Sequence, residues 1–128
     1  MENTEKLKNA RNLLLKLHKA MLDFERELYE GIHGRQSATD FINLLIEDED
    51  WAWLRKFSTL IVEIDEMFAS KTGIEPGMIE ANLSKVRELA EMKEPDEYFR
   101  AKYQFALQRE PNAAGLHSQL KALLHDAA

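Results

Sequence analysis

Residues 50–69 read DWAWLRKFSTLIVEIDEMFA, and this stretch decides the fold class. Its large apolar residues recur every three or four positions, at Trp53, Leu54, Phe57, Leu60, Ile61, Ile64, Met67 and Phe68. This spacing gathers them on one side of an α-helix, whereas a strand would divide them between two faces. A helix this apolar has to be covered by other helices, so the sequence predicts an all-α fold with residues 50–69 as its most buried element.

A second long helix is predicted over residues 4–32. Its apolar residues step by three and four, as in one helix of a left-handed bundle, at Leu7, Ala10, Leu14, Leu17, Met21, Phe24 and Leu28. Either Asn3 or Thr4 is expected to cap its start, and Gly31 or Gly34 its end. Three more leucines, Leu13, Leu15 and Leu22, widen the apolar stripe beyond what a surface helix needs.

Shorter helices are expected to close over these two. Ser37 is a capping residue for a short helix whose apolar run, Phe41, Ile42, Leu44, Leu45 and Ile46, predicts a place between the longer neighbours. No Gly or Pro separates this helix from residue 50, so a break there stays open. Further helices are predicted over residues 77–92, from Glu94-Pro95 to Glu110, and over 112–126. The sequence thus predicts one all-α domain, residues 1–128, a bundle of five or six helices with residues 4–32 and 50–69 as its long antiparallel members.

Composition excludes several classes of protein. The chain has no Cys, so it forms no disulfide and no thiolate metal site. Its net charge of −6 argues against a nucleic-acid partner, because phosphate binding needs a surplus of Lys and Arg. No apolar run of about 18 residues occurs, and the first residues lack the pattern of a signal peptide, so we expect a cytoplasmic protein with no membrane partner.

The charge is uneven along the chain. Residues 1–20 hold five basic and two acidic residues, a charge of +3, whereas residues 21–50 hold nine acidic and two basic residues, a charge of −7. One interpretation is a solvated helix surface. The other is a homodimer in which antiparallel copies pair a basic end with an acidic end, and whose affinity falls with added salt.

The stretch from Leu17-His-Lys through Phe24-Glu-Arg-Glu-Leu-Tyr-Glu30, Asp50-Trp-Ala-Trp-Leu54 and residues 60–66 resembles short, uncharacterised, all-helical bacterial proteins. The resemblance covers about the first half of the chain. It implies a bacterial cytoplasmic protein and no known activity, so it assigns no functional residue.

Two carboxylate patterns have the spacing of metal sites. Glu27-Leu-Tyr-Glu30 followed by Glu47-Asp-Glu-Asp50 is similar to the carboxylate pairs of all-α nucleotide pyrophosphohydrolases of the MazG type. That resemblance implies Mg²⁺ held by Glu27, Glu30, Glu47 and Asp50 and used to activate water. This chain departs from the family because Glu30 adjoins a helix end and no basic cluster follows. Separately, Glu30 and His33 have the spacing used twice in di-iron bundles, but here it occurs once.

Two further residues need an environment that the sequence does not supply. Trp51 and Trp53 are two positions apart, so only one of them can face the core, and the pattern places Trp53 there. Trp51 then either packs under the short helix or stays exposed as a partner site. Asp65 adjoins the apolar face and is predicted to pair with an Arg or Lys at its rim.

No motif for nucleophilic catalysis or phosphate binding is present, so no catalytic or cofactor-binding residue is predicted and an enzyme is disfavoured. The preferred hypothesis is a non-catalytic interaction or assembly module, as a homodimer or bound to a protein partner. Its candidate surface residues are Leu13, Leu15, Leu22 and Trp51. The alternatives are the Mg²⁺-dependent pyrophosphohydrolase and, third, a small-ligand sensor with an apolar pocket lined by Phe, Met and Trp.

Overall fold

The computed structural model describes residues 2–93 and 95–126, and within them it contains six α-helices, one short 3₁₀ helix and no strand. The elements are α1 (Asn3–His33), α2 (Ala38–Glu47), η1 (Glu49–Trp51), α3 (Ala52–Ala69), α4 (Met78–Ala90), α5 (Glu97–Arg109) and α6 (Pro111–Leu124). The predicted all-α bundle with two long antiparallel helices is confirmed. None of the described helices combines the length and the apolar character that crossing a bilayer requires.

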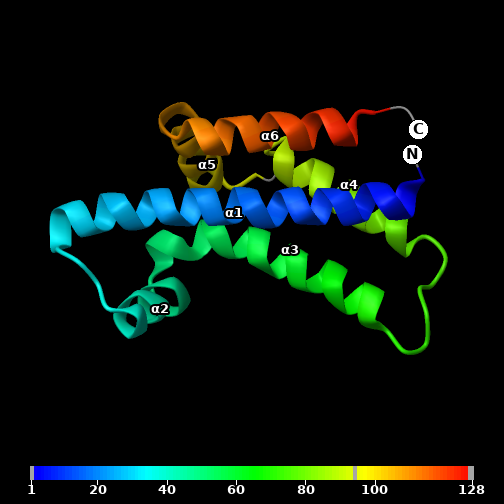
Figure 1. Cartoon of the computed structure of the whole chain (residues 1–128), viewed down its shortest axis with the longest axis horizontal. Coiled ribbons are helices and arrows are strands. Elements are labelled where there is room, and N and C mark those ends of the chain that lie inside the picture. Colours follow the sequence, from blue (N-terminus) through cyan, green and yellow to red (C-terminus); the bar gives the residue numbers. More distant parts are fainter. Residues whose placement is uncertain (1, 94, 127–128) are drawn as a thin grey trace.

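The helix with the most extensive packing is α1. It lies between α6 and α3, runs antiparallel to both, and packs against α4 as well (Figure 1). The prediction that residues 50–69 are the most buried element agrees with α3, in which seven of 18 residues are buried against seven of 31 in α1, although α1 packs more extensively against other helices. The wider stripe on α1 explains the difference, because a helix with neighbours on two sides needs more apolar width than one with neighbours on one side. Leu13 and Leu22 are half-buried against the core and supply part of that width.

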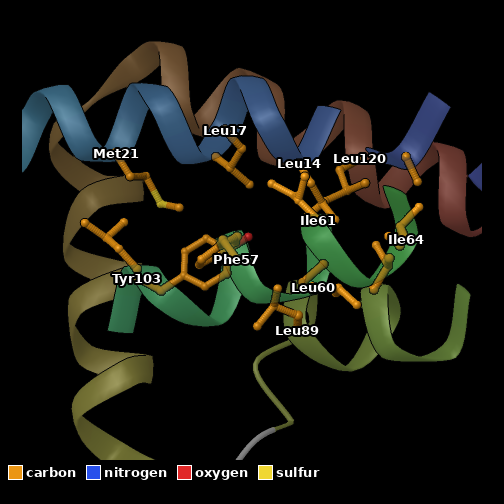
Figure 2. Packing of buried hydrophobic residues seen from close by; sticks show 14 of the residues in the cluster. Leu14, Leu17, Met21, Phe57, Leu60, Ile61, Ile64, Leu89, Tyr103 and Leu120 are labelled. Atoms are coloured by element: carbon orange, nitrogen blue, oxygen red, sulfur yellow. The ribbon is translucent and has the colours of Figure 1, made fainter. Parts of the chain in front are cut away.

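The core contains one side-chain cluster to which all six helices contribute. Leu14, Leu17 and Met21 of α1 point toward the apolar face of α3, with Tyr103 of α5 and Leu120 of α6 beside them (Figure 2). Trp53 is inside, as predicted, and its ring lies edge-on to Phe57 and Phe99 with centroids 6.3 and 6.4 Å away. Such edge contacts between aromatic rings add to the stabilisation from burial alone.

The helix ends follow capping chemistry at some sites only. Ser37 caps α2 as predicted, because its hydroxyl accepts from the backbone N–H of Asp40 at 3.1 Å. Gly34, with φ 84°, follows the end of α1. At the start of α1, the residue in the cap position is Glu2 and not Asn3 or Thr4, and no side-chain cap forms.

A true break separates α2 from α3. Asp48 adopts an extended backbone conformation there, and its carboxylate accepts from the N–H of Asp50 at 2.9 Å. An aspartate that caps the next turn ends one helix and starts another without Gly or Pro, which is why the break was not visible in the sequence.

The later helices start at different residues from those predicted. Gly77, with φ 86°, precedes α4, which begins at Met78 and not at residue 77. Asp96 caps α5 by accepting from the N–H of Phe99 at 3.1 Å. The predicted start at Glu94 lies outside the described residues. Pro111 is the first residue of α6, where its missing N–H removes no helix hydrogen bond.

Candidate interaction surface

The short helix α2 lies at one end of the bundle and is barely covered by it (Figure 1). Five of its ten residues are large and apolar, yet only Phe41 is buried. Ile42 is 53% exposed and Ile46 63% exposed. The prediction that α2 is wedged between the long helices is therefore wrong. Burying Ile42 and Ile46 against a partner would remove apolar surface from water at about 25 cal/mol per Å².

Aromatic contacts attach α2 to the rest of the molecule. Phe41 meets the ring of Trp51 edge-on at 5.4 Å, and Tyr29 of α1 lies 6.0 Å from Trp51 on another side. The guanidinium of Arg26 stacks over Phe41 at 4.4 Å. Trp51 itself is only 4% exposed. The candidate partner site at Trp51 is thus corrected: this residue packs under α2, the first of the two predicted environments, because α2 needs an apolar anchor.

Exposed apolar side chains also occur at the end of α1. This end extends beyond α6 and α3 (Figure 1), so Leu28 is 41% exposed and Ile32 79% exposed. Of the nine large apolar side chains that are exposed in the described residues, four belong to residues 25–51, and a fifth, Tyr98, borders them. We call residues 25–51 the acidic tip, because acidic residues outnumber basic ones there.

The acidic tip carries eight acidic and two basic residues, a charge of −6 that equals the net charge of the whole chain. Two of these carboxylates are neutralised locally. Glu25 pairs with Lys102 of α5 at 3.0 Å, and Glu30 pairs with Arg26 at 3.4 Å and accepts from the N–H of Gln36 at 2.8 Å. This backbone hydrogen bond is the main reason why the pKa of Glu30 is lowered. The remaining acidic residues, Glu27, Asp40, Glu47, Asp48, Glu49 and Asp50, form no ion pair within the described part of the chain.

A hollow of about 370 Å³ opens in the acidic tip beside Trp51. Leu28 and Ile32 of α1 line one part of it, and Asp48 and Asp50 line another. Tyr98 of α5 also lines it and donates its hydroxyl to the backbone carbonyl of Asp50 at 3.1 Å. The hollow therefore offers apolar and negatively charged surface side by side.

The four predicted Mg²⁺ ligands are not brought together. Glu27 lies in a shallow hollow with Asp23 and Glu110, Glu47 in another with Asp40 and Asp48, and Asp50 beside Trp51. Glu30 is occupied by Arg26 and Gln36. Across residues 2–93 and 95–126, no group of three or more His, Asp or Glu side chains is placed to hold a metal ion. The spacing that suggested a metal site in the sequence thus spans a turn that separates its members.

Of the three leucines proposed for the interaction surface, two pack partly against the core. Leu13 and Leu22 are half-buried, and Leu15 is 43% exposed on its own. The basic start of α1 is also engaged within the chain, as seen at three of its cations. Lys6 donates to the carbonyl of Asp126 at 2.6 Å, Arg11 binds Asp65, and Lys19 pairs with Asp23 at 2.8 Å.

The sensor hypothesis needs an apolar pocket lined by Phe, Met and Trp. Phe57, Met67 and Trp53 are packed in the core. A hollow of about 620 Å³ between α3 and α4 is lined by Trp53, Leu60 and Leu89 but also by charged residues of both signs. It is open to solvent, and it has no enclosed apolar character that would select a small apolar ligand.

Sequence reasoning missed the residues that make the tip apolar. Leu28 was assigned to the apolar stripe of residues 4–32, which was expected to be covered. A signal was present in residues 41–46, where apolar residues occur at adjacent positions. Adjacent positions are 100° apart around a helix, so such a run is wider than one buried face and leaves part of it in water.

Comparisons with protein-family models, with curated proteins and with solved structures find no match to this chain. The function therefore has to be argued from the geometry and charge of the acidic tip.

Proposed function

We propose that this protein is a non-catalytic interaction module that binds another protein through its acidic tip. The observation that carries the proposal is α2, a helix with five large apolar residues of which only Phe41 is buried. A monomer gains nothing from Ile42 and Ile46 in water, and exposed apolar residues gathered on one region of a surface mark binding sites. The tip lies at the end of the bundle opposite to residues 2 and 126, so it is accessible in a chain held by its ends.

The charge of the tip favours a different protein over a second copy. A two-fold dimer through the tip would place unpaired carboxylates such as Asp40 and Glu47 against those of the other copy, and like charges across an interface repel. In a dimer from basic end to acidic end, three of the five cations of residues 1–20, namely Lys6, Arg11 and Lys19, already have partners within the chain, which leaves Lys8 and Lys16 to pair with another copy. The homodimer is therefore the less favoured form of this function.

The experiment compares the wild type with two variants, each immobilised through one end of the chain. Ile42→Ser/Ile46→Ser removes apolar surface from the tip, and Val62→Ser removes it from α3, where Val62 is 51% exposed. A protein captured from a lysate is purified and titrated against all three forms. We expect affinity to fall about tenfold or more for the tip variant, at roughly 1 kcal/mol for each isoleucine, and to stay unchanged for Val62→Ser.

Two results would contradict this function. One is a partner that binds the tip variant and the wild type equally. The other is a dimer in light scattering that the tip variant dissociates, since the tip would then be a surface for self-association. A monomer near 14.8 kDa is the expected result.

A further inference from the structure

The hollow beside Trp51 has two unlike kinds of lining. Leu28 and Ile32 stand four positions apart on α1 and offer exposed aliphatic surface. Asp48 and Asp50, from the segment that joins α2 to α3, contribute carboxylates to the same hollow. The ring of Tyr98 lies in the same lining and is 45% exposed. A ligand that fills this space must therefore have both an apolar part and a positive charge.

The negative charge of this lining is not cancelled by the protein itself. Lys102 also lines the hollow, but it is paired with Glu25, with Nζ–Oε1 and Nζ–Oε2 distances of 3.0 and 3.2 Å. The carboxylate of Asp48 accepts one neutral donor, the N–H of Asp50. The pKa of Tyr98 is raised, first by burial and then by the charges of Asp50, Glu25 and Asp48. Asp48 and Asp50 are therefore the carboxylates of this lining that no cation of the described residues pairs with.

We propose that this hollow receives an arginine or lysine side chain from the protein segment bound at the acidic tip. The inference rests on the proposed function and specifies the chemistry of the partner. Both side chains have an aliphatic stem that can lie along Leu28 and Ile32 and a cationic head that can reach Asp48 and Asp50. Arginine fits best, because its planar guanidinium pairs with carboxylates through several N–H groups and stacks on aromatic rings such as that of Tyr98.

The same features define the rest of the bound segment. Its remaining contacts are with Ile42 and Ile46 of α2, so it has to present apolar residues beside its basic ones. An amphipathic helix with leucine on one face and arginine at the edge meets this description. The unpaired carboxylates of the tip repel phosphate, which excludes anionic lipid surfaces and nucleic acids as occupants.

The test uses short synthetic helical peptides and the whole protein. One peptide carries leucine on one face and arginine beside it, and the matched control peptide carries glutamine in place of every arginine. The protein variants are Asp48→Asn/Asp50→Asn at the hollow and Glu66→Gln/Glu88→Gln elsewhere, which remove the same charge. Asparagine at position 48 can still accept from the N–H of residue 50, so the helix break is preserved.

We expect the arginine peptide to bind the wild type and to bind Asp48→Asn/Asp50→Asn about tenfold more weakly. The variant Glu66→Gln/Glu88→Gln should change its affinity by less than about twofold, because charges far from the site are screened. Raising salt from about 50 mM to about 500 mM should weaken binding to the wild type and to Glu66→Gln/Glu88→Gln more than to Asp48→Asn/Asp50→Asn.

The inference is overturned if the glutamine peptide binds as tightly as the arginine peptide, or if Asp48→Asn/Asp50→Asn binds like the wild type. A failure of the proposed function gives a different result: the partner then binds Ile42→Ser/Ile46→Ser as tightly as the wild type. If the affinity of an apolar peptide depends on Ile42 and Ile46 but not on Asp48 and Asp50, the acidic tip is still a binding surface and its partner is uncharged.

Discussion

Arg11 of α1 donates to both carboxylate oxygens of Asp65 on α3, from Nε to Oδ1 and from Nη2 to Oδ2, each at 2.8 Å. The pair joins the two long helices at the rim of the core, where Asp65 was predicted to find a basic partner. The hydrogen bonds from Arg11 are the main reason why the pKa of Asp65 is lowered below its usual value of 3.8. Burial acts in the opposite direction and is overcome.

The first prediction is that Asp65→Asn lowers stability slightly and reduces its dependence on acid. The Asp65 side chain is 47% exposed, so solvent screening limits the loss to about 0.5 kcal/mol. A folded-state pKa below the unfolded value means that this stabilisation is present above about pH 4 and is lost as the pH falls through the folded-state pKa. Urea unfolding between pH 6 and pH 3 measures it. A variant as acid-sensitive as the wild type would contradict the assignment.

The second prediction concerns two histidines and the range from pH 7 to pH 5. Burial lowers the pKa of His18, and burial followed by the charge of Lys121 lowers that of His117, below the usual 6.5. The unfolded chain then binds protons more readily in this range, so the free energy of unfolding falls as the pH drops below about 6.5.

We expect His18→Gln/His117→Gln to flatten this part of the stability profile. Glutamine at position 117 can keep the hydrogen bond to the hydroxyl of Tyr103, which lies 2.8 Å from His117 Nδ1. Chemical denaturation at several pH values makes the measurement, and His33→Gln, which changes an exposed histidine, is the matched control. An equal slope in the double variant and the wild type would refute the role of these two groups.

The third prediction is that Phe41→Ala releases α2 without unfolding the bundle. Phe41 is the one buried residue of α2, so its replacement should destabilise this helix and not the rest of the bundle. Hydrogen exchange should accelerate at the amides of residues 40–47, and Trp51 emission should shift to the red as its ring is uncovered. Phe57→Ala, in the shared core, is the contrast and should cost about 3–5 kcal/mol of global stability. A Phe41→Ala variant with unchanged exchange in α2 would mean that other contacts hold this helix.

The fourth prediction is that Mg²⁺ or Mn²⁺ at millimolar concentration leaves the melting temperature unchanged. If Glu27, Glu30, Glu47 and Asp50 formed a site, the ion would bind only the folded state. At an ion concentration 100 times the dissociation constant, this would raise the free energy of unfolding by about 2.7 kcal/mol, and the melting temperature with it. The structure places these residues in separate surroundings, so no such linkage is expected. A clear rise with Mg²⁺, lost in Glu47→Gln, would restore the pyrophosphohydrolase hypothesis.

Periodicity made the helices and much of the core predictable. The three-four spacing from Leu7 to Met21 and from Trp53 to Met67 reports which side of each helix is buried, because burial repeats with the helical turn. The same spacing failed at Leu28, since periodicity says that a side is apolar and not whether another helix reaches it. How far α1 extends beyond its neighbours depends on tertiary packing.

The candidate site was less predictable than the core for a related reason. A carboxylate pattern such as Glu27, Glu30, Glu47 and Asp50 gives spacing along the chain, but convergence depends on the turn at Gly34 and the break at Asp48. The position of Trp51 depended on the same break, which turns its ring beneath Phe41. Local capping interactions, which leave a weak trace in sequence, therefore decided the arrangement of the tip.

The most direct measurement is an NMR titration of the labelled protein with the arginine-bearing peptide, recording the backbone amide shifts of every helix. We predict that the largest shifts fall on residues 28–33 and 41–51 and on Tyr98, with the amides of α4 and α6 almost unmoved. Shifts confined to the hollow between α3 and α4, or absent at saturating peptide, would contradict the claim that the acidic tip is the binding surface.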